Sequence, residues 1–488
     1  MDLNYRSIVR YTGLLLILLG LSLLLPYFVA LIYHESDAAS AFLTPAMPCL
    51  GAGALMFALR PAESRAFRRR DAYFFVSFSW LLFSLIGAVP FVVDGCIDSF
   101  VDAFFETCSG FSTTGASILT DVEALPKSMM FWRLFTHWIG GMGILVLMIA
   151  LIPAVSGKSG QAIAQFESPG PSLSKFMPKM RDMAKMLYFL YGSFTLIEIL
   201  CLKLAGMNWY DAIVYSFSTM GTGGFATHNA GIAAYHSAAI EWVLILFMIL
   251  AGVNFNLYYL ALARQPSVFR HDAEFRMYML IIGVVTLLCT LDLLGTGVMH
   301  SVGSALRAAL FQVVSILTTT GFSSADYTLW PTFCMMLLFL LFFIGGCSSS
   351  TAGGIKVVRV TVLLKLMKRS FSLRLHPNAF FKVRLNHRQI PSDIIQQICS
   401  FTFLYIITVL AAGLLISIDG NDLITNFSAA ASCVGNIGPG FNAVGPAGNY
   451  SIFSPFSTCT LAVCMIAGRL ELFTFFMLVT PKFWNPSH

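Results

Sequence analysis

Four short turns rich in threonine and glycine are the residues of this sequence whose types and spacing suit a chemical task. They read Thr113-Thr114-Gly115-Ala116, Thr222-Gly223-Gly224-Phe225, Thr319-Thr320-Gly321-Phe322 and Asn436-Ile437-Gly438-Pro439. Glycine permits backbone angles that turn successive carbonyl oxygens toward one point, and threonine adds hydroxyl oxygens. Four such turns around one axis predict a ring of oxygen ligands for a dehydrated cation.

The turns belong to a repeat. The turn glycines Gly115, Gly224, Gly321 and Gly438 are separated by 109, 97 and 117 residues. A pair of small residues follows each turn glycine, and the four pairs are Gly140-Gly141, Ala251-Gly252, Gly345-Gly346 and Ala467-Gly468. The second residue of each pair lies 26, 28, 25 and 30 residues, respectively, after the turn glycine of its repeat. One Thr-Thr-Gly alone would be read as an ordinary loop, and one small pair as a close helix contact. Two landmarks whose spacing is similar in all four copies indicate a fourfold internal repeat.

Each turn requires helices to position it. A semi-apolar stretch too short to cross a bilayer precedes each turn, and these stretches predict half-helices from Phe100 to Phe111, Tyr210 to Met220, Ala305 to Leu317 and Leu423 to Val434. Their C-terminal ends would bring about half a negative charge each toward the axis, which favours a cation. Turns at membrane depth must be buried in protein or line water, and four turns meeting on one axis satisfy that condition together.

The composition places these helices in a membrane. The 488 residues are 57% hydrophobic and 11% charged, with a mean hydropathy of +0.77, which excludes a soluble globular protein. Apolar stretches long enough to span a bilayer cover about 9–33, 41–59, 72–94, 185–205, 277–298 and 397–418, and four more follow the turns. The first stretch is too long for a signal peptide and is read as a retained helix.

We therefore predict an all-α polytopic membrane protein with ten transmembrane helices. Two leading helices occupy 1–71, and four repeats of outer helix, half-helix, turn and inner helix surround one pore in a pseudo-fourfold arrangement. Repeat 1 with a cytoplasmic linker covers 72–184, repeat 2 covers 185–276, repeat 3 with another linker covers 277–394, and repeat 4 covers 395–488.

Charge sets the expected orientation. Basic residues gather in alternate loops, at Arg60, Arg65 and Arg68 to Arg70; at Lys158, Lys175, Lys179 and Arg181; at Arg264, Arg270 and Arg276; and between Lys365 and Arg388. The positive-inside rule makes these loops and both termini cytoplasmic. The net charge of +6 then follows from topology, and no nucleic-acid partner is needed. Eleven scattered cysteines show neither a disulfide framework nor metal-ligand spacing.

The third inner helix carries an insert that the other repeats lack. It runs Gly345-Gly346-Cys347-Ser348-Ser349-Ser350-Thr351-Ala352-Gly353-Gly354, followed by Ile355 and Lys356. Four glycines and a serine run predict an unwound intramembrane segment below the turns. The alternative is a continuous helix in close contact with a neighbour.

Several charged residues are placed inside the predicted membrane region. Arg469 follows the small pair of repeat 4, where an arginine costs roughly 2.5 to 3.5 kcal/mol, so it is expected to face the pore or pair with another helix. Glu198 and Asp292 in outer helices suit either a functional or a packing role. Asp102 and Glu106 on the first half-helix suit concentration of cations at the mouth, or Asp102 only favours the N-terminus of the half-helix. His137 is expected to pack rather than to bind a ligand.

At these residues the chain resembles the Trk/Ktr/HKT superfamily of potassium- and sodium-translocating subunits, most closely its bacterial TrkH branch. The resemblance covers the whole chain and rests on Ser112-Thr113-Thr114-Gly115-Ala116, Met220-Gly221-Thr222-Gly223-Gly224-Phe225, Thr318-Thr319-Thr320-Gly321-Phe322 and Gly435-Asn436-Ile437-Gly438-Pro439-Gly440. It implies potassium as the transported ion, no organic cofactor, and a potassium filter formed by Thr114, Gly115, Gly223, Gly224, Thr320, Gly321, Ile437 and Gly438. The fourth turn departs from the threonine pattern.

The resemblance also implies a gate, partners and a location. The gate comprises the intramembrane loop with Gly345, Gly346, Ser348, Ser349, Ser350, Gly353, Gly354 and Lys356, opposed by Arg469. The implied assembly is a homodimer in the lipid of a bacterial inner membrane. Cytosolic nucleotide-binding regulatory subunits of the TrkA type would dock on its basic inner face.

Two other classes of function compete with this interpretation. A proton- or sodium-coupled secondary cation transporter calls for inverted repeats and a relay of intramembrane carboxylates, whereas these repeats are parallel. An enzyme calls for paired catalytic carboxylates, metal-ligand histidines or a phosphate-binding glycine loop, and none of these motifs occurs in the cytoplasmic segments. The sequence therefore predicts a channel-like transport protein and no enzymatic activity.

Overall fold

The computed structural model describes residues 3–58, 68–143, 180–263, 267–379, 381–386 and 388–484, and over these residues the protein is almost entirely helical. The strands among them are β1 (Arg384–Leu385) and β2 (Arg388–Gln389), which pair antiparallel in a small hairpin. Part of the basic residues of the sequence and most of the predicted linker of repeat 1 lie outside the described ranges: Arg60, Arg65, Lys158, Lys175, Lys179 and Arg264.

Six long helices coincide with the six leading and outer spans predicted from hydropathy. They are α1 (Tyr5–Ile32), α2 (Ser36–Ala58), α3 (Arg69–Asp94), α8 (Met180–Leu204), α13 (Ala273–Gly295) and α17 (Ser392–Ile416). Among the described residues these six are long and apolar enough to cross a membrane, and the number rises to eight if two bent helix pairs each count as one span. Ten crossings therefore stay a prediction.

The four predicted half-helices are confirmed, with ends that differ by at most three residues. They are α4 (Phe100–Phe111), α9 (Trp209–Gly221), α14 (Val302–Leu317) and α18 (Leu423–Gly435). Polar caps begin three of them: the side chains of Ser99, Asn208 and Asp422 accept hydrogen bonds from backbone N–H groups in the first turn. Each of the four ends at a turn that carries one of the glycines.

The inner helices are shorter than predicted. They are α5 (Lys127–Gly141), α10 (Ala238–Gly252), α15 (Thr332–Leu341) and α19 (Pro455–Arg469). The small pairs mark the ends of these helices: in repeats 1, 2 and 4 the helix ends at the pair or one residue beyond it. The chain bends by 90° between α10 and α11 (Phe255–Leu262) and by 111° after α19.

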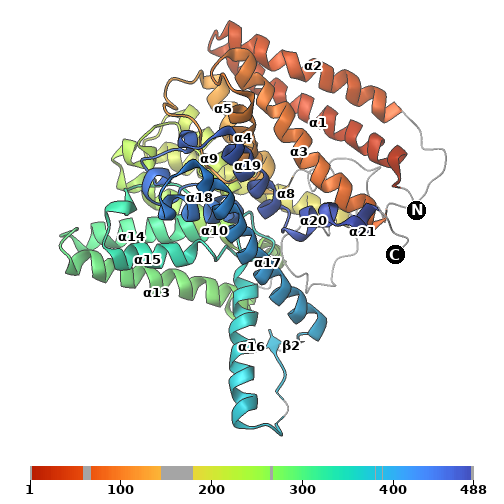
Figure 1. Ribbon diagram of the computed structural model, residues 1–488. Helices are drawn as coiled ribbons and strands as arrows, with labels where there is room; N and C mark the ends of the chain where they lie inside the picture. Colours follow the sequence, from red (N-terminus) through yellow and green to blue (C-terminus); the bar gives the residue numbers. More distant parts are fainter. Residues whose placement is uncertain are drawn as a thin grey trace.

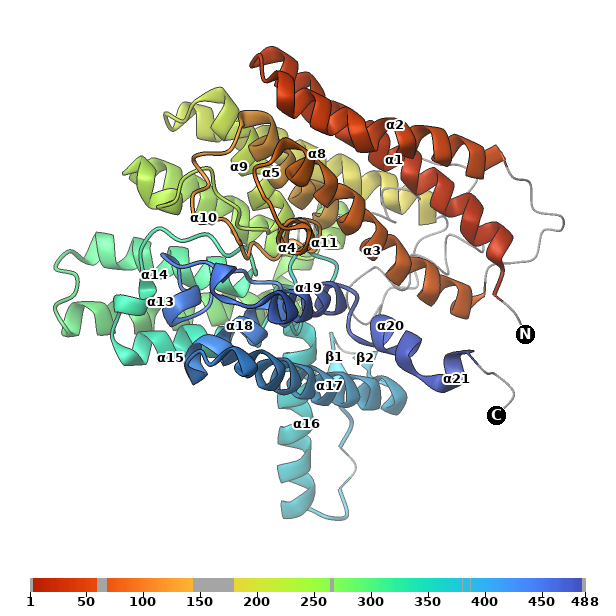
Figure 2. The same ribbon diagram turned by 45° about the horizontal axis from the view of Figure 1, so that its top comes forward.

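Shorter elements connect these helices. Helix α16 (Val357–Leu375) follows the glycine-serine segment of repeat 3 and projects away from the body beside the β1–β2 hairpin, whereas α1 and α2 lie together at one edge (Figures 1 and 2). The remaining short helices are α12 (Val268–His271), α20 (Phe473–Phe476) and α21 (Pro481–Trp484), with 3-10 turns at Gly231–Tyr235, Tyr327–Leu329, Ser417–Asp419, Asn442–Val444, Tyr450–Ile452 and Met477–Val479.

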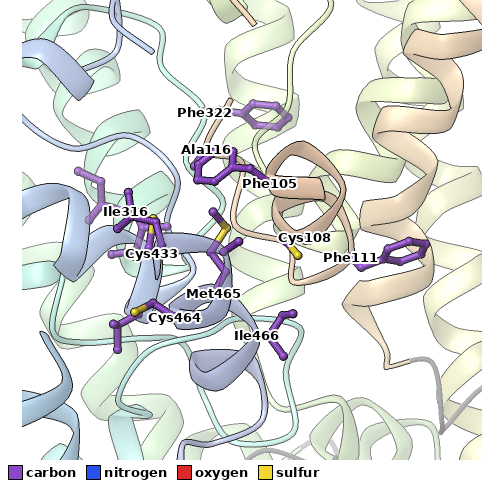
Figure 3. Close-up of a cluster of buried hydrophobic side chains, with 14 of the residues drawn as sticks. Phe105, Cys108, Phe111, Ala116, Ile316, Phe322, Cys433, Cys464, Met465 and Ile466 are labelled. Atoms are coloured by element: carbon purple, nitrogen blue, oxygen red, sulfur yellow. The ribbon is translucent and has the colours of Figure 1, made fainter. Parts of the chain in front are cut away.

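The repeats close into a ring because each inner helix packs on the half-helix of the next repeat. Helix α5 contacts α9, α10 contacts α14, and α19 of the last repeat contacts α4 of the first. Between repeats 3 and 4, the Phe339 ring of α15 lies 5.8 Å from the Phe427 ring of α18. Apolar side chains fill the space between these elements, among them Cys108 of α4, Cys433 of α18 and Met465 of α19 (Figure 3).

Candidate functional site

The four turns share one backbone conformation. The residue two positions before each turn glycine and the glycine itself both have positive φ angles. The pairs are Thr113 and Gly115 (56° and 82°), Thr222 and Gly224 (54° and 81°), Thr319 and Gly321 (55° and 80°), and Asn436 and Gly438 (56° and 103°). A left-handed conformation costs a threonine about 1–2 kcal/mol, so the surrounding structure must hold these residues in place.

A serine near the end of each half-helix supplies part of that restraint. It lies six residues before the turn glycine, and its carbonyl oxygen accepts a hydrogen bond from the N–H of the residue that precedes the glycine. The four bonds join Thr114 to Ser109 (2.9 Å), Gly223 to Ser218 (2.8 Å), Thr320 to Ser315 (2.8 Å) and Ile437 to Ser432 (3.0 Å). This serine repeats in the sequence at the same offset from each turn glycine, and that offset is the signal by which it can be found.

The turns meet one another around a common centre. A Cβ atom built on each turn glycine would collide with the carbonyl oxygen of the residue before the turn glycine in the next repeat. The collisions run from Gly115 to Gly223, from Gly224 to Thr320, from Gly321 to Ile437 and from Gly438 to Thr114. Because this sequence of contacts returns to its starting repeat, the four turns form a closed ring, and no side chain fits at the glycine positions.

The ring carries carbonyl oxygens that have no hydrogen-bond partner. Within the part of the chain that the structure describes, seven of the eight carbonyl groups of the turn glycines and of the residues directly before them accept no hydrogen bond: those of Thr114, Gly115, Gly223, Gly224, Thr320, Gly321 and Ile437. Thr114, Gly223, Thr320 and Ile437 are buried, and buried backbone carbonyls are rarely left unpaired, because desolvation without a partner is unfavourable. A cation stripped of its water is the partner that such a set of oxygens suits.

The side chains of the turns mostly bind one another. The Thr114 hydroxyl lies 2.6 Å from the Ser112 hydroxyl and accepts a hydrogen bond from the Asn436 amide at 3.0 Å, and the Thr320 hydroxyl lies 2.8 Å from that of Thr318. Asn436 also donates to the carbonyl of Met465 in α19. The departure of the fourth turn from threonine therefore has a local consequence: its asparagine ties the turn of repeat 4 to the turn of repeat 1.

A second position, nine residues before the turn glycine, holds the segment that follows the turn in three of the four repeats. In repeat 1 the Glu106 carboxylate accepts from the Ile118 N–H at 2.8 Å, and in repeat 2 the Tyr215 hydroxyl accepts from the Thr227 N–H at 3.2 Å. In repeat 3 the Gln312 amide donates to the Ala325 carbonyl at 3.2 Å. Repeat 4 has Ala429 there. Sequence reasoning missed this set, although its common offset is visible once the repeats are aligned.

Glu106 is part of a buried ion pair rather than a cation trap at the mouth. Its carboxylate lies 2.5 Å from Nε of Arg133, and the two side chains are 0% and 2% exposed. Arg133 in turn donates to the carbonyl of Ala226, just beyond the second turn. The pair thus joins the segments that follow the first and the second turn. Asp102 lies in the first turn of α4, where its backbone N–H donates to the capping Ser99.

His137 packs against the turns, as predicted, and takes part in their support. Its Nδ1 lies 2.7 Å from the Gly110 carbonyl, and its Nε2 lies 3.3 Å from the backbone nitrogen of Phe225. These partners assign the neutral tautomer with the proton on Nδ1, because a carbonyl accepts and an N–H donates. The ring also occupies the space beside Gly223, where any Cβ would collide with it.

The insert of repeat 3 is non-helical, as predicted, and it lies against the undersides of two turns. The chain has no helical structure from residue 342 to 356, between α15 and α16. Near its tip, the N–H of Gly353 donates to the Thr319 hydroxyl at 2.7 Å, and a Cβ on Gly353 would meet Asn436 at 2.9 Å. At its neck, the N–H of Gly345 donates to the Ile355 carbonyl at 2.8 Å. The loop is therefore closed on itself directly beneath the ring.

Glu274 fastens the same loop from the outer helix α13. Its buried carboxylate accepts hydrogen bonds from the Ser348 N–H at 2.6 Å, the Ser348 hydroxyl at 2.7 Å and the Val358 N–H at 3.2 Å. The Glu274 carboxylate thus binds both Ser348 in the first half of the loop and Val358 at the start of α16. Glu274 could not be identified from the sequence, since it is distant from the loop in the chain and belongs to no repeated motif.

Arg469 and Lys356 also bind backbone carbonyls of this region. The Arg469 guanidinium donates to the Thr351 carbonyl at 2.7 Å and to the carbonyls of Gly140 and Gly141 at 2.8 and 2.6 Å. It therefore joins the loop to the inner helix of repeat 1. Lys356, which is buried, donates through Nζ to the Ala352 carbonyl. The neighbouring Glu471 pairs with Arg359 of α16.

Two cavities lie on either side of the ring. A cavity of about 150 Å³ is lined by all four turn glycines and by the strands that leave the turns. A second cavity, of about 50 Å³, is lined by residues of the loop and of the inner helices, among them Gly141, Gly353, Lys356 and Arg469. The ring and the loop thus lie between the two cavities.

The two carboxylates of the outer helices have different surroundings. Glu198 is completely buried in α8, and neither of its carboxylate oxygens has a hydrogen-bond partner among the described residues. Asp292 of α13 accepts a weak hydrogen bond from the Cys334 thiol at 3.2 Å. No cluster of three or more His, Cys, Asp or Glu side chains able to hold a metal ion occurs in the part of the chain that the structure describes.

The long apolar helices define a polytopic helical membrane protein, with the ring of turns and the loop beneath it at the centre of the described residues. Residues 39–485 match the family model of TrkH cation transport proteins, and the chain belongs to this family. It is 35% identical to the Trk system potassium uptake protein TrkH of Salmonella typhimurium and 36% identical to that of Vibrio parahaemolyticus, covering 99% of this chain and 100% of each relative.

Another relative and a solved structure agree with this assignment. The Trk system potassium uptake protein TrkG of Escherichia coli is 33% identical over 99% of both chains. The crystal structure of the potassium transporter TrkH from Vibrio parahaemolyticus superimposes with a TM-score of 0.89 at 34% identity, over 99% of this chain and 100% of that one. The resemblance inferred from the four turns is therefore confirmed.

Proposed function

We propose that this chain is the potassium-translocating membrane subunit of a bacterial potassium uptake system, with channel-like permeation along the axis of the ring. The observation that carries the proposal is the closed ring of unpartnered carbonyl oxygens between two cavities. The names of the relatives, which are potassium uptake proteins, support the choice of ion.

The filter acts by replacing water. An ion enters the outer cavity, loses part of its hydration shell at the ring and is coordinated by backbone oxygens of Thr114, Gly115, Gly223, Gly224, Thr320, Gly321 and Ile437. Gly438 closes the ring of turns between repeat 4 and repeat 1. The C-terminal ends of α4, α9, α14 and α18 point at this place, and their partial negative charges lower the energy of a bare cation there. Side-chain carboxylates are not needed at the ring.

The loop of repeat 3 and Arg469 form the gate. In the arrangement described here the segment with Gly345, Gly346, Ser348, Ser349, Ser350, Gly353 and Gly354 covers the inner side of the ring, and Arg469 places a positive charge at its edge. Lys356 adds a second charge at the base of the loop. Opening requires the bonds of Gly353 to Thr319 and of Arg469 to Thr351 to break, so that the ion path widens and its electrostatic barrier falls.

Flux measurements on the purified chain test the proposal. The protein alone, in liposomes at fixed voltage, is expected to pass potassium and rubidium faster than sodium and lithium. Equal fluxes of all four ions, or flux that requires a second solute, would count against a carbonyl filter. Activity on a covalent substrate would overturn the prediction that the chain is not an enzyme.

A coupled transporter is the second candidate, and Glu198 is the observation that favours it. A buried carboxyl without hydrogen-bond partners is the type of group that carries protons in secondary transporters. Coupling predicts that potassium uptake follows an imposed proton gradient at fixed voltage and that Glu198→Gln removes this response. Uptake that is independent of the gradient in both proteins supports the channel-like mechanism.

The assembly we propose is a homodimer in the bacterial inner membrane with both termini in the cytoplasm. Large apolar side chains on the outer helices, such as Phe403 and Leu414 of α17, are largely exposed and suit contact with lipid. Cytosolic nucleotide-binding subunits of the TrkA type would dock on the basic projection formed by α16 and the β1–β2 hairpin (Figure 1).

A further inference from the structure

One of the four turn glycines differs from the other three in what its carbonyl binds. Within the described residues the carbonyl oxygens of Gly115, Gly224 and Gly321 accept no hydrogen bond. The carbonyl oxygen of Gly438 accepts one from the hydroxyl of Tyr450, at 2.7 Å. The fourth turn is therefore the one whose glycine carbonyl is already engaged by the protein.

The backbone of the fourth turn differs at the same residue. The φ angle of Gly438 is 103°, whereas those of Gly115, Gly224 and Gly321 lie between 80° and 82°. The residues two positions earlier, in contrast, all have φ angles of 54° to 56°. Of the two positive φ angles in the turn, the one that departs thus belongs to the glycine that Tyr450 binds.

Tyr450 is held in place by repeat 1 as well as by its own repeat. Its side chain is buried, with 2% of the residue exposed, and its ring centroid lies 5.5 Å from that of Phe105 in α4. Its backbone N–H donates to the Ser117 carbonyl at 2.9 Å, in the strand that leaves the first turn. The hydroxyl cannot follow Gly438 freely toward the axis, because these contacts fix the position of the ring.

We propose that Tyr450 is a specificity-determining residue that withholds the Gly438 carbonyl from the permeating ion. This inference depends on the proposed function as a carbonyl-lined cation pathway. The layer formed by the turn glycines then offers three free oxygens to the ion instead of four. The hydroxyl acts as a positioning group, since it binds the filter backbone and not the ion.

Fewer oxygens in one layer have a predictable effect on selectivity. Potassium prefers more ligands than sodium, and discrimination between the two depends on the number and field strength of the coordinating carbonyls. A layer with one carbonyl withheld favours potassium less than a layer with four. The engaged carbonyl of repeat 4 therefore lowers the preference for potassium over sodium below what a symmetric ring would give.

The variant Tyr450→Phe tests the inference, and Tyr327→Phe is its matched control. Tyr327 is also a fully buried tyrosine, and its hydroxyl donates at 2.8 Å to the carbonyl of Gly440, two residues beyond Gly438. Both variants lose one hydroxyl from a bond to the backbone of the same segment. The wild-type chain and both variants are purified, and their potassium and sodium fluxes are measured separately in liposomes at one voltage.

We expect Tyr450→Phe to raise the ratio of potassium to sodium flux about twofold or more, with Tyr327→Phe at the wild-type ratio. An unchanged or lower ratio in Tyr450→Phe, or an equal rise in Tyr327→Phe, overturns the inference while the proposed function stands. Absence of cation flux in the wild-type chain overturns the proposed function itself. If Tyr450→Phe does not fold, Tyr450→Met also lacks the donor, fills the site and carries the same expectation.

Discussion

At the scale of single residues, the turn glycines combine two requirements that no other residue meets. Gly321 has a φ of 80°, and a Cβ added to it would strike the Ile437 carbonyl of the next repeat. An L-residue in this conformation costs about 1–2 kcal/mol before the collision is counted. Relief of both strains requires that the carbonyl of Ile437 move, and this carbonyl is one of the proposed ligands.

Gly321→Ala is therefore expected to reduce the selectivity for potassium over sodium roughly tenfold, since each 1.4 kcal/mol of lost discrimination corresponds to one factor of ten. Flux ratios in liposomes measure the effect. Gly192→Ala is the control, because Gly192 lies in the long helix α8 and a Cβ there meets nothing within 4 Å. A selective Gly321→Ala protein would contradict the assignment of the ring as the filter.

Asp121 provides a pH-dependent contact at the outer rim. The Asn229 amide donates to its carboxylate at 2.8 Å and the Glu123 N–H at 3.0 Å, and these hydrogen bonds hold the pKa of Asp121 below its ordinary value. A lowered pKa in the folded state means that the contact stabilises the protein above the unfolded-state pKa, near 3.9, and that this stabilisation is lost as the pH falls through the folded-state value.

Thermal unfolding should reveal this contact. Asp121→Asn is expected to lower the melting temperature at pH 6, and the difference from the wild type should shrink as the pH falls below about 4. Replacing Asn229 by Ala should remove most of the difference, because the two side chains act as one unit. A difference that is constant over this pH range would exclude the carboxylate as its cause.

At the scale of elements, the loop of repeat 3 is a segment without regular structure that is held by a few specific bonds. Glu274 provides three of these, to Ser348 and Val358, and all three are charge-assisted. Hydrogen bonds to a charged group contribute about 1.5–3 kcal/mol each in typical cases. The position of the loop under the ring therefore depends on one carboxylate of the outer helix.

Glu274→Gln is expected to raise potassium flux roughly tenfold by weakening these bonds, with the ratio of potassium to sodium unchanged because the ring is not altered. Glu241→Gln is the control: Glu241 pairs with Arg307 at 2.8 Å, remote from the loop, in a pair that is partly exposed.

Arg469→Ala should also raise potassium flux, because the variant loses the hydrogen bond to Thr351 and the positive charge beside the loop. Reduced or unchanged flux in both gate variants would show that the loop does not limit permeation.

At the scale of the whole molecule, a fourfold arrangement on one chain allows each repeat to differ. Repeat 3 carries the loop, repeat 4 carries Arg469 and Tyr450, and repeat 1 carries the Glu106–Arg133 pair. A tetramer of identical subunits would repeat each feature four times, and four loops could not occupy one place under the ring. Helix α16 adds a further asymmetry, because it extends from repeat 3 away from the body as a charged helix (Figure 2).

The basic surface of α16 predicts an electrostatic docking site. Lys368 and Arg374 are exposed on this helix, and the double variant Lys368→Glu/Arg374→Glu is expected to slow association with cytosolic regulatory subunits about tenfold at low salt. The effect should decrease at high salt, where exposed charges are screened. Binding measured at two ionic strengths checks this, and the flux of the chain alone should not change. Salt-independent binding would place the docking surface elsewhere.

The sequence by itself determined the class of protein, the six long helices and the position of each half-helix and turn. Hydropathy and glycines at regular intervals are local signals, and local signals are sufficient to place local structure. The non-helical insert of repeat 3 was predictable for the same reason. The ring itself could be inferred only because four glycine turns, each a weak signal alone, recur with similar spacing to the small pairs.

Only the tertiary structure decided which residues support the ring and how the loop is held. Glu274 and Ser348 are 74 residues apart, and Arg469 and Gly140 are 329 apart. No spacing rule joins such pairs, since their contact depends on how the repeats pack. The ends of the inner helices could not be predicted from the sequence, because an apolar stretch does not show where a neighbouring backbone forces it to bend. The hydrogen bond from Tyr450 to Gly438 could not be predicted either, because it depends on how repeats 1 and 4 pack.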